Sequence, residues 1–98
     1  MATFISTVRF TDAGLKNIRD TGKRAAAFKT AAKKLGVKVT EVYWTLGPFD
    51  GLLVFDAPDD ETATAAMLQL SSAGNVHTQT VRAFKASEME AIVGKLSS

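Results

Sequence analysis

The 98-residue chain contains no cysteine, so it can form neither a disulfide framework nor a metal site with thiolate ligands. His77 is the only histidine, which excludes a two-histidine iron site and leaves no second imidazole for a typical zinc site. No stretch approaches the roughly 20 apolar residues of a membrane-spanning helix, and the N-terminal MATFISTVRF lacks a basic leader followed by a long apolar run. We therefore expect a cytoplasmic protein with no metal, no cofactor and no membrane segment.

A large surplus of charge is also absent, because 12 basic and 10 acidic residues give a net charge of +2. The densest basic cluster has helical spacing and is typical of a solvated helix face: Lys23, Arg24, Lys29, Lys33 and Lys34. The chain shows no helix-turn-helix spacing, zinc finger or paired aromatic RNA-binding motif. Nucleic acid is therefore not an expected partner.

Four segments have strand character. Residues 4–10, 37–46 and 75–84 are rich in β-branched and aromatic side chains, and polar residues are interspersed among them. Residues 51–57, GLLVFDA, are apolar with little alternation, which is typical of a strand covered on both faces. The turn over residues 47–51, GPFDG, contains two glycines and a proline, so the second and third strands are expected to form a hairpin.

Helices are predicted between and after these strands. A short helical turn follows Asp12, and apolar residues at helical spacing predict a helix over 23–35 that Gly36 ends. A second long helix opens on the acidic residues 59–61 and ends before Gly74. A capping box is predicted at the start of a C-terminal helix, formed by Ser87 and Glu90.

The resulting order, βαββαβ followed by a C-terminal helix, predicts one α+β domain over residues 1–98. This order is typical of the ferredoxin-like fold, a four-stranded antiparallel sheet with helices on one face. In strand 37–46, a regular alternation places Val39 and Tyr43 on one face and Val42 and Trp44 on the other, unless a bulge shifts the register.

Apolar residues on both sheet faces predict that the chain assembles with itself. Helices can cover one face only, and an exposed apolar face commonly marks an interface. We expect a homodimer or larger homo-oligomer in which two sheets pack face to face as a dimeric α+β barrel. The alternative is a monomer whose C-terminal helix folds across the open face.

The segment WTLGPFDGLLVFDAPDDE, with GLKNIRD before it and GNVHTQTVRAF after it, resembles the GYD domain family. The Gly-Tyr-Asp signature of that family corresponds here to Gly47, Phe49 and Asp50, with Pro48 inserted. Phe49 lacks the phenolic hydroxyl of tyrosine, which counts against any mechanism that needs it. The family resembles the dimeric α+β barrels and has no characterised function, so the resemblance implies a fold more than an activity. A similar turn occurs in the effector-binding domains of leucine-responsive regulators, which bind amino acids at subunit interfaces.

Two functions remain open. The first is a homo-oligomer that binds a small aromatic or amino-acid-like ligand in a cavity between the sheet and the subunit interface. The residues predicted to bind it are Arg9, Tyr43, Trp44, Phe49, Asp50 and Arg82. The second is a cofactor-independent enzyme of the monooxygenase or isomerase type, in which Glu41, Tyr43 or His77 transfers a proton. Each residue also has a structural interpretation, because turn chemistry, an ion pair and interface packing use the same residue types.

Overall fold

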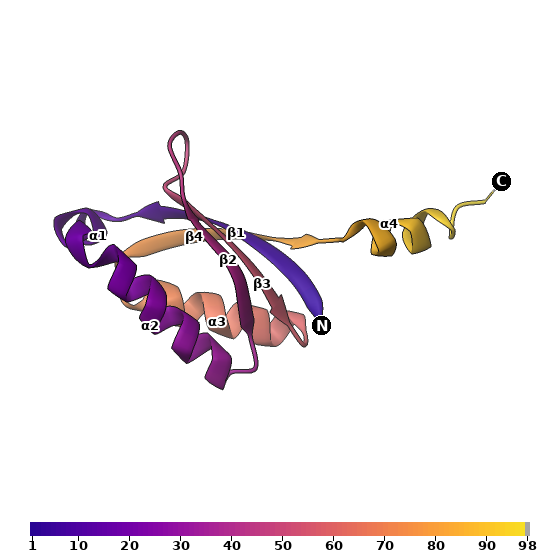
Figure 1. Ribbon diagram of the computed structural model, residues 1–98, viewed down its shortest axis with the longest axis horizontal. Helices are drawn as coiled ribbons and strands as arrows, with labels where there is room; N and C mark the ends of the chain where they lie inside the picture. The colour runs from indigo at the N-terminus through magenta and orange to yellow at the C-terminus, as the bar shows by residue number, and fades with distance from the viewer. Residues whose placement is uncertain (98) are drawn as a thin grey trace.

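The computed structural model describes residues 1–97 and confirms the ferredoxin-like α+β fold (Figure 1). The strands are β1 (Ala2–Phe10), β2 (Lys38–Trp44), β3 (Gly51–Ala57) and β4 (Val76–Ala83). They form one antiparallel sheet in the order β2-β3-β1-β4. The helices are α1 (Asp12–Lys16), the 3-10 turn η1 (Ile18–Asp20), α2 (Thr21–Lys34), α3 (Asp60–Ser72) and α4 (Ala86–Val93).

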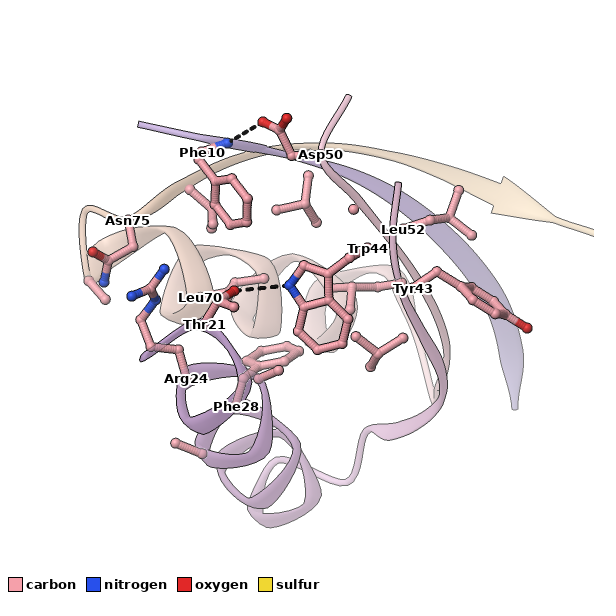
Figure 2. Close-up of a pocket in the computed structure, with 18 of the residues that line it drawn as sticks. Phe10, Thr21, Arg24, Phe28, Tyr43, Trp44, Asp50, Leu52, Leu70 and Asn75 are labelled. Atoms are coloured by element: carbon pink, nitrogen blue, oxygen red, sulfur yellow. Dashed lines mark hydrogen bonds between the residues drawn. The ribbon is translucent and has the colours of Figure 1, made fainter. Parts of the chain in front are cut away.

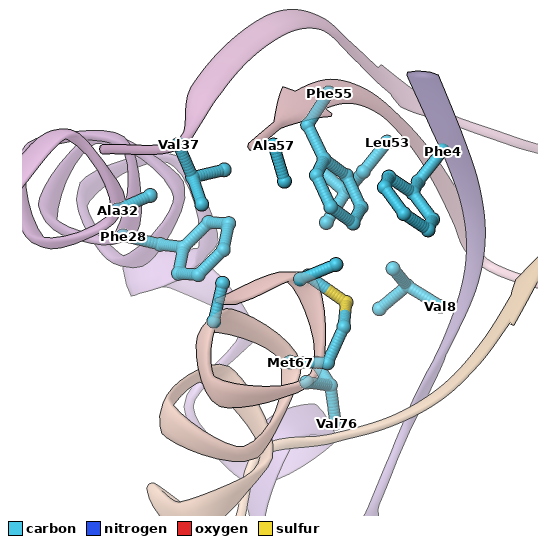
Figure 3. Close-up of a cluster of buried hydrophobic side chains, with 12 residues drawn as sticks. Phe4, Val8, Phe28, Ala32, Val37, Leu53, Phe55, Ala57, Met67 and Val76 are labelled. Carbon is cyan, nitrogen blue, oxygen red and sulfur yellow. The ribbon is translucent and has the colours of Figure 1, made fainter. Parts of the chain in front are cut away.

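The hydrophobic core lies between the sheet and helices α2 and α3, which cover the same face (Figures 1 and 3). Phe55 of β3 is fully buried at its centre, and its ring stacks on that of Phe4 with the centroids 5.4 Å apart. Small residues let the helices approach closely, since Ala32 of α2 and Ala66 of α3 are both buried. Each long helix therefore turns one apolar side toward the sheet: Phe28 and Ala32 on α2, and Ala63, Ala66 and Met67 on α3.

A β-bulge in β2 decides which residues face the core. The register between β2 and β3 shifts between Val39 and Glu41, so that Val39 pairs with Phe55 and Val42 pairs with Leu53. Both valines pack on the helix side as a result, and Tyr43 points to the other side. The regular alternation that groups Val39 with Tyr43 is therefore wrong, because the extra residue at the bulge reverses the side-chain direction.

The opposite face of the sheet carries no helix among the described residues. Strand pairing aligns one row of residues across it and a second row beside the first: Glu41, Val54, Ile5 and Val81, then Tyr43, Leu52, Thr7 and Gln79. The side chains of Val81 and Tyr43 are 61% and 51% exposed. We call this helix-free surface the open face, and its centre is apolar.

Helix α4 extends away from the sheet as an arm (Figure 1), so it does not fold across the open face. Met89 and Val93 of this helix, and Leu96 just beyond it, are apolar side chains that are at least half exposed. The helix begins at Ala86, and the carboxylate of Glu88 accepts a 2.9 Å hydrogen bond from the backbone nitrogen of Lys85. The predicted capping box of Ser87 and Glu90 is therefore wrong by two residues.

Candidate functional site

A pocket of about 370 Å³ lies between the sheet and helices α2 and α3, on the side opposite the open face (Figure 2). Its walls are mostly apolar, and three aromatic side chains stand around it: Phe10, Phe28 and Trp44. The wall that α2 supplies is made largely of alanines, including Ala25, Ala27 and Ala31. Because alanine leaves the space beside a helix unfilled, this end of the sheet is not packed as densely as the core.

Trp44 joins the sheet to α2 at the mouth of this pocket. Its indole Nε1 donates a hydrogen bond to Thr21 Oγ1 at 3.0 Å, and Thr21 is the first residue of α2. The bulge in β2 directs Trp44 toward the helices rather than the open face. The indole is thus held in one position while 52% of the residue stays exposed, which suits a ring that covers a ligand.

Asp50 connects the β2–β3 turn to β1 and lines the same pocket. Its Oδ2 accepts a 2.9 Å hydrogen bond from the backbone nitrogen of Phe10, and its own backbone nitrogen donates to the carbonyl of Val8 at 2.8 Å. An aspartate in a turn typically accepts hydrogen bonds from backbone amides of the same turn. The structure instead places the donor of the side-chain bond in β1, because the turn folds back over the end of that strand.

We expect Asp50→Ala to lower the free energy of unfolding by about 1 to 2 kcal/mol, because the Phe10 amide loses a charged acceptor. Denaturant unfolding followed by circular dichroism measures this change. Glu90→Ala is the matched control, since Glu90 is an exposed acid on α4, and it should change stability by less than about 0.5 kcal/mol. Equal stabilities for Asp50→Ala and the wild type would show that the bond between turn and strand contributes nothing.

Arg24 and Asn75 lie together at the end of the pocket away from Trp44 (Figure 2). The guanidinium of Arg24 donates to the carbonyl of Asn17 at 2.6 Å and to that of Gly14 at 3.3 Å. Gly14 also lies against Asn75, so closely that a Cβ at position 14 would be 2.1 Å from the Asn75 carbonyl oxygen. A glycine in α1 is therefore what brings the two polar side chains to one place.

The three proton-transfer candidates all lie on the open face, but not together. Glu41 and Tyr43 belong to β2, whereas His77 belongs to β4 and pairs with Arg9 of β1. Since β2 and β4 are the two edge strands, three strand spacings of about 4.8 Å, or about 14 Å, separate them. The negative charge of Glu41 raises the pKa of the Tyr43 phenol above its ordinary value. At neutral pH the phenol therefore stays protonated and is a poor base.

Arg82 does not join Arg9 on the open face. It pairs with Phe4, so its side chain projects to the helix side, where the guanidinium lies over the rings of Phe4 and Phe84 at 5.7 and 4.6 Å. Its charge is partnered by Glu88 at 3.7 Å, the one ion pair within residues 1–97. Arg9 and Arg82, both predicted to bind the ligand, therefore lie on opposite sides of the sheet within one chain.

Of the six predicted ligand-binding residues, the structure brings three to the pocket: Tyr43, Trp44 and Asp50. The ring of Tyr43 points away from it (Figure 2). Phe49 is partly buried in the turn, where its carbonyl accepts a 2.7 Å hydrogen bond from Thr45 Oγ1, and it does not line the pocket.

Sequence reasoning missed Arg24 and assigned it to a solvated helix face. A usable signal was present, because Thr21, Arg24 and Phe28 are three and four residues apart and so share one face of α2.

The described part of the chain holds no cluster of three or more histidine, aspartate and glutamate side chains placed to bind a metal ion. Of the helices within residues 1–97, none has both the length and the apolar character needed to cross a membrane.

Comparisons with known proteins agree with this fold. The GYD domain profile matches residues 4–93. The Thermus thermophilus protein named glutamine synthetase and cystathionine beta-lyase binding protein is 34% identical over 90 residues, or 91% of this chain and 95% of the relative. A crystal structure from the same organism matches with a TM-score of 0.57 and 28% identity, over 88% of this chain and 96% of that one. MtbAldR matches in fold, with a TM-score of 0.61 and 18% identity, over 86% of this chain and 53% of its own.

Proposed function

This chain belongs to the GYD domain family, and from that premise we propose that it is a homo-oligomeric binding protein without catalytic activity. It holds a small aromatic or amino-acid-like ligand and engages a protein partner. The observation that carries the proposal is the placement of two apolar surfaces on opposite sides of one sheet: the pocket on the helix side and the open face on the other. Assembly and ligand binding can therefore occur at the same time.

Self-association through the open face is the first part of the proposal. Ile5, Val54 and Val81 form a continuous apolar row across three strands, and no other part of the described chain covers it. Face-to-face packing with a second sheet would remove this row from water, at about 25 cal/mol for each Å² of apolar surface buried. A protein of 98 residues gains from such burial, because a small domain hides a smaller share of its surface than a large one.

Ligand binding in the pocket is the second part. A volume of about 370 Å³ falls within the range of small-molecule sites. Aromatic walls and a few polar groups at the rim are also the usual composition of such sites. The predicted cavity between two subunits is replaced in this proposal by the pocket between sheet and helices, because that is where Trp44 and Asp50 lie.

A protein partner is supported by the relative from Thermus thermophilus, whose name states that it binds glutamine synthetase and cystathionine beta-lyase. The match spans 95% of that relative, so the two chains are comparable over nearly their whole length. We extend to this chain the binding of an enzyme as its protein partner.

A cofactor-independent enzyme of the monooxygenase or isomerase type is the alternative. Such chemistry needs a proton-transferring group beside the bound substrate. Glu41 and His77 lie on the open face, whereas the pocket lies on the other side of the sheet. Tyr43 lines the pocket but points its phenol ring away from it (Figure 2). Binding is therefore the function that the geometry favours.

Native mass spectrometry of the protein purified gently from its own host tests assembly and ligand retention together. The expected result is a mass of at least two 10.5 kDa chains, with an additional discrete small mass. A bare monomer would contradict the assembly proposal. An oligomer with no added mass would keep the assembly proposal and contradict a tightly held ligand. Where a compound is retained, incubating it with the protein and testing whether it is converted separates a binder from an enzyme.

A further inference from the structure

Arg24 is the only cationic side chain that lines the pocket, and within residues 1–97 its charge is not balanced by a carboxylate. From this arrangement we infer that the pocket binds a small organic carboxylate with an aromatic or branched apolar body and no amino group. The inference rests on the ligand-binding part of the proposed function and gives that ligand a chemical class.

The guanidinium of Arg24 is held in place by two main-chain carbonyls. Two of its five N–H donors are used by the carbonyls of Asn17 and Gly14. Those acceptors are neutral main-chain groups, so they fix the position of the guanidinium without neutralising it. Because the side chain is partly buried and held in place, little conformational freedom remains to be lost when a carboxylate binds.

Asn75 supplies a second polar group at the same end. Figure 2 shows its side-chain amide beside the guanidinium of Arg24, and the contact between Gly14 and the Asn75 backbone fixes this neighbourhood. An amide N–H and a guanidinium N–H together match the two oxygens of one carboxylate. The apolar body of the ligand would then extend between Phe28 and the indole of Trp44.

The absence of an amino group in the ligand follows from where the acidic residue stands. Among the described residues, Asp50 is the only carboxylate lining the pocket, and Figure 2 places it away from Arg24, beyond Phe10. In an amino acid the ammonium is attached beside the carboxylate, so it would lie next to the guanidinium with no acid to balance it. Simple aryl acids and 2-oxo acids avoid this repulsion. A phosphate is a poorer match, because one guanidinium would have to balance a larger charge.

Trp44 provides the measurement, because it is the only tryptophan in the chain and it stands in the pocket wall. We would titrate the wild-type protein at neutral pH with 3-phenylpropionate and with the neutral 3-phenylpropanol, and follow the fluorescence of Trp44. The expected result is saturable binding of the acid at least about tenfold tighter than binding of the alcohol, as a charged hydrogen bond implies. Equal affinities, or no saturable change with the acid, would overturn the inference.

Variants of α2 assign the preference to one residue. Arg24→Gln should bring the affinity for the acid down to that for the alcohol, and Arg24→Lys should retain part of the preference because it keeps the charge. Lys23→Gln is the matched control, since Lys23 is an exposed neighbour that does not line the pocket. A full preference in Arg24→Gln would overturn the inference. Circular dichroism identifies a misfolded variant, and the comparison of acid and alcohol in the wild type needs no variant.

L-Phenylalanine, titrated in the same way, tests the exclusion of the amino group. It is expected to bind at least about tenfold more weakly than 3-phenylpropionate, because its ammonium lies beside Arg24. An equal or tighter affinity would overturn that part of the inference.

Native mass spectrometry of the same samples separates this inference from the proposed function. Tight binding of the alcohol by an intact oligomer would leave the proposed function in place, whereas a monomer that binds no probe would contradict both.

Discussion

A Tyr43→Asp variant is expected to be monomeric under conditions in which the wild type is a dimer or larger oligomer. Tyr43 lies on the open face with half of its surface exposed, and its strand neighbour there is Leu52. The substitution would place a second carboxylate close to Glu41 within an apolar interface, and burying an unpaired charge costs several kcal/mol. Sedimentation velocity or native mass spectrometry reports the change directly.

Leu68→Asp is the matched control for this prediction. Leu68 is 66% exposed on α3, so the same loss of an apolar side chain and gain of a charge should leave the oligomer unchanged. An unchanged mass for Tyr43→Asp would exclude the sheet-to-sheet interface. If a chain truncated after Lys85 were then monomeric, the interface would instead involve the exposed apolar side of α4.

Gly14→Ala is expected to lower the free energy of unfolding by about 2 to 3 kcal/mol, because overpacking of this kind forces a backbone shift. The added Cβ would lie 2.1 Å from the carbonyl oxygen of Asn75. The same oxygen accepts a hydrogen bond from the Thr11 backbone nitrogen at 3.0 Å, so the shift would also strain the end of β1. Denaturant unfolding measures the loss.

Gly22→Ala is the control for Gly14→Ala. Gly22 lies in the first turn of α2, and a Cβ there meets nothing within 4 Å. Alanine is the better helix former, so this variant should be neutral or more stable by up to about 1 kcal/mol. Equal losses at the two positions would show that the contact with Asn75 does not limit the residue at position 14.

The element order was predictable because it depends on local periodicity. Phe28, Ala32 and Leu53 lie at positions whose spacing identifies them as apolar faces of a helix or a strand, and all three are buried. The apolar run of β3 was likewise informative. Leu53 and Phe55 face the helices, while Leu52 and Val54 face the side without helices and remain partly exposed.

The pocket was less predictable because it depends on register and on space between elements. Nothing in VKVTEVYW marks where the bulge falls, and its position decides that Trp44 lies toward α2. Arg9 and Arg82 were both expected to bind the ligand, but the pairing of β1 with β4 matches Arg9 with His77 and Arg82 with Phe4. That register is set by the pairing of the whole sheet. The residue types of the two strands therefore did not show that the two arginines lie on opposite sides.

The bulge in β2 also constrains how the length of this chain can change. Thr40 is the extra residue, since Val39 pairs with Phe55 and Glu41 pairs with Val54, so its deletion would restore regular alternation and leave both valines facing the helices. An insertion or a deletion elsewhere in β2 would shift the alternation by one residue and turn part of the strand to the wrong side. The hairpin tip carries no such constraint, since Leu46 is fully exposed there. Changes in length among homologues are therefore expected to gather at the tip and, within β2, to be confined to position 40.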